Sequence, residues 1–91
     1  MKRRIHVWIY GVVKGVFFRA YTKEEADKLG IKGFVRNIDD GVEAVFEGDS
    51  EKLKKILEFC KRGSPYSKVE KVITKEENYT GEFKEFKILY F

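Results

Sequence analysis

A segment near the N-terminus combines glycine with permanent positive charge. Residues 11–19 read GVVKGVFFR and run from an alternating apolar segment to the start of a helical one. Glycines permit backbone angles that turn successive N–H groups inward, which makes a nest for an anion. A helix N-terminus adds partial positive charge, and Arg19 adds a planar guanidinium suited to phosphate oxygens. The segment from Gly11 to Arg19 therefore predicts an anion-binding loop that is suited to a phosphate.

A G-x-x-x-G spacing also occurs in ordinary strand-to-helix connections, with turn glycines and a surface arginine. The loop is not a Walker A motif, because Val16 follows Gly15 and no GK[ST] is present. Taken alone, the spacing therefore favours the ordinary connection.

Other kinds of chemistry have few residues available. His6 is the only histidine and Cys60 the only cysteine, so no Cys/His metal site or internal disulfide is expected. We predict no metal and no cofactor. His6 lies in a strand pattern and is expected to be an ordinary strand residue, and Cys60 is expected to be a small core residue.

Size and charge limit the class of protein. The 91 residues fit one domain, 1–91, and 43% of them are hydrophobic, enough for a single core. No apolar run approaches membrane-spanning length, so we expect a cytoplasmic protein. The net charge is +4 with the basic residues spread along the chain, which makes a nucleic-acid partner unexpected. Abundant Lys and Glu, with no Gln, hint at a thermophilic source.

The first half of the chain predicts three strands and a helix. Ile5–Tyr10 alternates as a strand does, and Thr22 with Glu25 forms a capping box for a helix that ends at Gly30. Two further strands, Gly33–Asn37 and Val42–Glu47, are joined by a hairpin with Asp40-Gly41 as its turn signal.

The second half predicts a helix and two extended segments. Asp49 or Ser50 caps the helix, and Gly63 ends it. Its apolar positions recur at helical spacing and are Leu53, Ile56, Leu57 and Cys60. Lys68–Glu77 and Glu82–Phe91 are extended, and Phe86, Ile88 and Tyr90 share one face of the latter.

This order predicts an α+β, ferredoxin-like βαββαβ sandwich. It consists of an antiparallel sheet with two helices on one face and a short extra C-terminal strand. In such a fold the first two strands run the same way, so the 11–19 loop and Asn37 meet at one edge of the sheet.

Two segments resemble the acylphosphatase family. The family's loop reads like G-x-V-Q-G-V-x-F-R and stands here as GVVKGVFFR. A second signature, like G-[FW]-V-[KR]-N, stands here as Gly33–Asn37. The resemblance extends over nearly the whole chain at matching spacing. Two departures are Lys14, where the family usually has Gln, and Asp39, where Pro is common. Lys14 is expected either to be a solvated loop lysine or to add charge beside the phosphate.

The resemblance implies metal-independent hydrolysis of a small acyl phosphate, with inorganic phosphate as a product. It implies that Arg19 and the backbone N–H groups of residues 14–19 bind the phosphoryl oxygens, and that Asn37 positions the attacking water. The many Lys and Glu residues disfavour edge-strand pairing, so a monomer is expected.

Two alternatives stay open. One is a noncatalytic module on the same fold that binds anions or nucleic acid, since a fold does not by itself define a function. The other is an accessory or regulatory domain that works with a partner.

Overall fold

The computed structural model describes residues 1–90. Along the chain the elements are β1 (Lys2–Val12), α1 (Phe18–Leu29), β2 (Lys32–Ile38), β3 (Gly41–Asp49), α2 (Ser50–Arg62), β4 (Lys68–Glu77) and β5 (Phe86–Leu89). The predicted βαββαβ order and the short extra strand are confirmed. Phe91, the last residue of the predicted segment Glu82–Phe91, lies outside the described residues.

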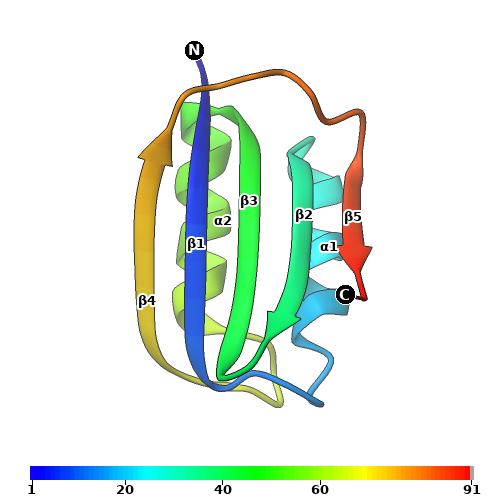
Figure 1. Cartoon of the computed structure of the whole chain (residues 1–91), viewed down its shortest axis with the longest axis vertical. Helices are drawn as coiled ribbons and strands as arrows, with labels where there is room; N and C mark the ends of the chain where they lie inside the picture. Colours follow the sequence, from blue (N-terminus) through cyan, green and yellow to red (C-terminus); the bar gives the residue numbers. More distant parts are fainter. Residues whose placement is uncertain (91) are drawn as a thin grey trace.

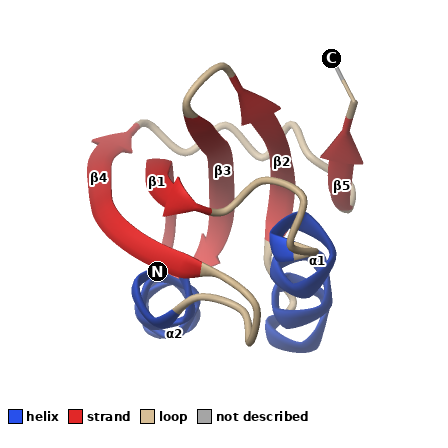
Figure 2. Cartoon of the chain, turned by 90° about the horizontal axis from the view of Figure 1, so that it is seen from below, coloured by secondary structure: helices blue, strands red, loops and turns tan. Residues whose placement is uncertain are grey.

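The strands form one sheet in the order β4-β1-β3-β2-β5, and both helices lie on the same face of it (Figures 1 and 2). β1 pairs antiparallel with β3 and β4, and β2 pairs antiparallel with β3. The sheet is mixed rather than purely antiparallel, because β5 pairs parallel with β2. The connection from β4 crosses to the far edge of the sheet before β5 begins, so β5 runs in the same direction as β2 (Figure 1).

Alternation along the strands separates a helix-facing side from an open side. Opposite one another on the helix-facing side stand Val7 and Ala44, Ala44 and Val35, and Val35 and Ile88. This side packs on the buried helix residues Phe18, Ala26, Leu53, Ile56, Phe59 and Cys60. In residues 1–90 no helix is long and apolar enough to span a membrane.

Helix α1 begins earlier than the capping-box motif predicts. It starts at Phe18, so Thr22 lies inside the helix, where its Oγ1 donates to the carbonyl of Phe18 at 2.8 Å. Phe17 stands at the N-cap in the left-handed region and supplies no side-chain cap. The predicted end at Gly30 is confirmed. The capping-box prediction fails because the loop turns directly into the helix through the backbone of Phe17.

The β2–β3 hairpin turns one residue earlier than its Asp-Gly signal predicts. Asp39 and Asp40 form the turn, while Gly41 is already paired with Ile38. Gly41 does not have a positive φ. Its role is close approach, because a Cβ at this position would collide with the carbonyl oxygen of Ile9 on β1.

Helix α2 follows its predicted pattern closely. Asp49 is the N-cap residue, although its side chain makes no capping bond, and Gly63 follows the last turn. Leu53, Ile56 and Cys60 are buried, and Leu57 is partly buried against the core. The helical spacing therefore identified the buried face.

On the open side, Glu47 holds the connection between β4 and β5. Its side chain is buried and accepts hydrogen bonds from the backbone N–H groups of Thr80 at 3.0 Å and Gly81 at 3.1 Å. The Thr80 hydroxyl donates to it at 3.1 Å, and Arg4 donates at 3.4 Å. One carboxylate thus fixes the path of the chain toward β5.

A second cluster on the open side is centred on His6. Its ring is hydrogen-bonded to Glu43 at 2.7 Å and Glu77 at 3.0 Å, and it stacks on Trp8 with ring centroids 4.0 Å apart. Burial raises the pKa of the Glu43 carboxyl, but hydrogen bonds from Arg36 and His6 outweigh that effect and lower this pKa below its ordinary value. The cluster joins β1, β3 and β4.

Replacing Glu47 by Gln is expected to lower the free energy of unfolding by about 1.5–3 kcal/mol, because an amide N–H₂ would then face backbone donors. Urea denaturation at pH 7 measures the change. Glu85→Gln, at an exposed residue of the same connection, is the control. A loss no larger than that of the control would contradict the role of Glu47.

Protein stability is expected to fall in acid through Glu43. The pKa of Glu43 is lower in the folded protein than its unfolded value of about 4.3, so the ionised carboxylate stabilises the fold above pH 4.3. This stabilisation is lost as the pH falls through the folded-state pKa. Unfolding free energies measured between pH 7 and pH 3 should fall less steeply for Glu43→Gln than for the wild type. Glu58→Gln, on the exposed side of α2, should retain the wild-type slope. Equal slopes for all three proteins would exclude Glu43 as the cause.

Candidate anion-binding site

Three segments meet at the edge of the sheet where β1 and β2 end. They are the β1–α1 loop and the β2–β3 turn, at the lower end of Figure 1, and the C-terminal end of β5, which points toward the same end. The meeting of the loop with the turn was predicted from the parallel course of the first two strands, whereas the place of β5 beside them was not. Segments distant in sequence therefore build one site.

The loop backbone has the alternation that a nest requires. Gly15 has φ 73° and Phe17 has φ 62°, while Val16 between them does not have a positive φ. Alternation of left-handed with ordinary backbone turns successive N–H groups toward a common centre. Phe17 adopts an angle that costs an ordinary residue energy, and such strain concentrates at functional sites.

The N-terminus of α1 is free of side-chain competitors. Its first intrahelical bond runs from the N–H of Tyr21 to the carbonyl of Phe17 at 3.0 Å, so the N–H groups of residues 18–20 have no acceptor within the helix. No side chain caps this end and no acidic residue stands in the first turn. Such an end attracts anions.

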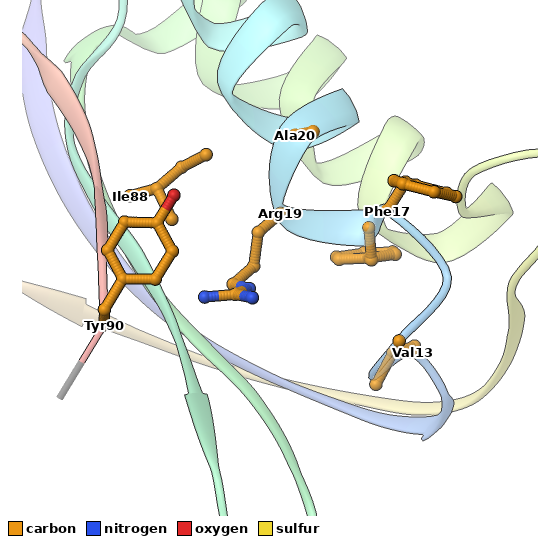
Figure 3. Close-up of a pocket in the computed structure, with 8 residues that line it drawn as sticks. Val13, Phe17, Arg19, Ala20, Ile88 and Tyr90 are labelled. Atoms are coloured by element: carbon orange, nitrogen blue, oxygen red, sulfur yellow. The ribbon is translucent and has the colours of Figure 1, made fainter.

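Arg19 lies between two pockets, each of which it lines together with Tyr90. The first pocket, of about 260 Å³, lies between the loop and β5 and also has Val13, Gly15, Phe17, Phe18, Ala20 and Ile88 in its walls. The guanidinium stands over the ring of Tyr90, with its carbon 5.1 Å from the ring centroid. Figure 3 shows Tyr90 on one side of Arg19 and Val13 on the other.

Asn37 lines the second pocket, of about 270 Å³, with Arg19, Leu89 and Tyr90. Asn37 is two residues beyond the buried Val35 on β2 and so lies on the helix-facing side of the sheet. Its Oδ1 is buried and has no hydrogen-bond partner among the described residues. Buried polar atoms are almost always paired, so this oxygen is suited to accept a hydrogen bond from a ligand or a water molecule.

The six predicted loop residues take different positions. Gly15, Phe17, Phe18 and Arg19 line the first pocket. Val16 is partly buried against the core. The Lys14 ammonium donates to the β2–β3 turn, at 2.9 Å to the carbonyl of Ile38 and 2.7 Å to that of Asp39. Lys14 is thus neither fully solvated nor among the residues that line the pockets of Arg19.

Sequence reasoning missed Tyr90 as a residue of the site. The alternation of Phe86, Ile88 and Tyr90 was visible and indicated a shared face. The pairing of Val35 with Ile88, which brings this face beside Arg19, is a property of the tertiary structure. The alternating pattern therefore identified the face that includes Tyr90 but did not place that face in the fold.

His6 and Cys60 lie away from the site, as predicted. His6 is on the open side of the sheet, and Cys60 is fully buried in α2, where burial raises the pKa of its thiol to about 12. Among residues 1–90, no group of three or more His, Cys, Asp or Glu side chains is arranged to hold a metal ion.

Comparison with known proteins gives a consistent result. A model of the acylphosphatase family matches residues 5–88. An acylphosphatase of Syntrophobacter fumaroxidans is 57% identical over 90 residues, covering 98% of this chain and 93% of that protein. An acylphosphatase of Pyrobaculum aerophilum, one of several thermophilic relatives, is 51% identical over 88 residues, covering 94% of this chain and 93% of that protein.

The structural comparison agrees with the sequence comparison. The crystal structure of acylphosphatase from Bacillus subtilis superposes with a TM-score of 0.92 at 35% identity, covering 99% of this chain and 100% of that chain. Family model, sequence relatives and fold all extend over nearly the full chain. The chain therefore belongs to the acylphosphatase family.

Proposed function

We propose that the protein hydrolyses the carboxyl–phosphate anhydride of a small acyl phosphate, releasing a carboxylate and inorganic phosphate. Its acylphosphatase relatives support an enzyme that acts on acyl phosphates. The observation that carries the finer proposal is the buried, unpartnered Oδ1 of Asn37 in the pocket that it shares with Arg19.

In this proposal the phosphoryl group binds between the loop and Arg19. The backbone N–H groups of residues 14–19 and the guanidinium donate to its oxygens. Because the donors are held by the loop and by the start of α1, they are oriented before the reaction begins. Positioning and charge stabilisation are what phosphoryl transfer mainly requires.

Asn37 holds the attacking water, with Oδ1 accepting a hydrogen bond from it. The water oxygen bonds to phosphorus, and the bond from phosphorus to the acyl oxygen breaks. The carboxylate leaves with that electron pair. The described residues that line the two pockets include no carboxylate or histidine, so the proton of the water passes to a phosphoryl oxygen or to solvent.

The leaving group makes this sparse site sufficient. The conjugate acid of a carboxylate has a pKa of about 4, so the group departs without a general acid. We therefore propose a metal-independent reaction, with stable phosphate monoesters as poor substrates. A monomer and a cytoplasmic location remain predictions from the sequence.

The first test is hydrolysis of benzoyl phosphate in the presence of EDTA. Arg19→Ala and Asn37→Ala should each lower kcat/KM by about 10²–10³, the usual cost of one electrostatic donor. Arg3→Ala and Asn78→Ala are the matched controls at exposed positions and should retain activity. Circular dichroism verifies that every variant is folded.

The outcomes separate the parts of the proposal. Loss of activity in Arg19→Ala alone would keep the reaction and remove the role of Asn37. No turnover by folded wild-type protein over a range of temperatures would overturn the enzyme proposal. Salt-dependent binding of nucleic acid would then favour the noncatalytic module, and a stable complex in a pull-down would favour the accessory domain.

Tyr90 is expected to hold the Arg19 guanidinium in place. A cation–π contact at an exposed site contributes about 0.5–1 kcal/mol, so Tyr90→Ala should raise the inhibition constant of inorganic phosphate about two- to fivefold. Tyr90→Phe keeps the ring and should behave as the wild type, as should Tyr79→Ala at another exposed tyrosine. Equal effects of the Ala and Phe variants would contradict a role for the aromatic ring.

A further inference from the structure

Lys14 joins two segments of the site that the chain itself keeps apart. Its ammonium donates to the carbonyls of Ile38 and Asp39, 24 and 25 positions along the sequence, at 2.9 and 2.7 Å. Ile38 is the last residue of β2 and directly follows Asn37. One side chain of the phosphate-binding loop is therefore attached to the turn that immediately follows Asn37.

The loop makes hydrogen bonds to two different segments. Besides the bonds of Lys14 to the turn, the hydroxyl of Ser64, which follows α2, donates weakly to the carbonyl of Val16 at 3.5 Å. Among the described residues, the two bonds of Lys14 are the hydrogen bonds that connect residues 13–18 of the loop with residues 38–40 of the turn.

The charge of Lys14 is directed at carbonyl oxygens rather than into the pockets. Neither pocket that Arg19 lines has Lys14 in its wall. Hydrogen bonds from a charged donor are stronger and shorter than neutral ones, and two consecutive carbonyls define the direction of approach. A merely solvated lysine would not have this geometry.

We propose that Lys14 is a positioning residue that sets the separation between the phosphate-binding loop and Asn37. The inference rests on the proposed function, in which the loop holds the phosphoryl group and Asn37 holds the water. The rate of in-line attack depends on the distance and direction between these two, and a shift of about 1 Å can cost 10²-fold. The Lys14 side chain acts on the reaction through Asn37 and does not touch the substrate.

A double-mutant cycle with benzoyl phosphate tests this inference. Lys14→Met keeps an unbranched side chain and removes the donors, and it should lower kcat about tenfold while changing the inhibition constant of phosphate less than about twofold. Lys14→Arg keeps a cationic donor and should restore most of kcat. In an Asn37→Ala background, Lys14→Met should have almost no further effect, because the residue through which it acts is gone.

Lys54→Met is the matched control, since it removes the same charge from an exposed position on α2. It should leave kcat unchanged. If Lys14→Met instead weakened phosphate inhibition and left kcat intact, Lys14 would be a charge beside the phosphate. If its effect were as large in Asn37→Ala as in the wild type, it would not act through Asn37. Either result overturns the inference.

A readout without activity distinguishes this inference from the proposed function. ¹⁵N relaxation by NMR should report increased motion at residues 37–40 in Lys14→Met and wild-type order in Lys54→Met. If the wild type were inactive and Lys14→Met still showed increased motion at the turn, the proposed reaction would be overturned but the attachment of the turn by Lys14 would stand. An unchanged turn in Lys14→Met would overturn the attachment even in an active enzyme.

Discussion

The pairing of β1 and β2 on either side of β3 is the constraint on which the site depends. Because both pair antiparallel with β3, both end at the same edge of the sheet. The period of two along β2 then places Asn37 on the helix-facing side, beyond Val35. A shift of one residue in this register would turn Asn37 to the open side, away from Arg19.

The two sides of the sheet carry different functions. The helix-facing side is mainly apolar. At the edge of the sheet where β1 and β2 end, Asn37, Ile88 and Tyr90 lie near the start of α1, because each lines a pocket with Arg19. The open side holds a polar network in which Glu47 secures the connection to β5. Since Tyr90 directly follows β5, a carboxylate remote from the pocket contributes to its wall through the path of the chain.

The site has few charged groups, and backbone N–H groups add to its positive potential. The nest angles at Gly15 and Phe17 and the uncapped start of α1 present N–H groups, to which Arg19 adds one full charge. Such donors need not gain or lose a proton, which suits the proposed reaction, in which the leaving group departs unaided.

The sequence by itself determined the order of the elements and the glycine-bounded loop, because alternation, glycine spacing and charge are local properties. The topology predicted from that order placed Arg19 and Asn37 at one edge of the sheet. The sequence correctly predicted that the two helices end at Gly30 and Gly63, and it identified the buried face of α2. It failed at Thr22 and at the Asp40-Gly41 turn, where the tertiary context overrode local preference. Only the tertiary structure decided that β5 pairs parallel with β2, that Arg19 stands over the ring of Tyr90 and that Lys14 is hydrogen-bonded to the β2–β3 turn. These are contacts between distant segments, and they depend on strand order and register, which no local pattern encodes.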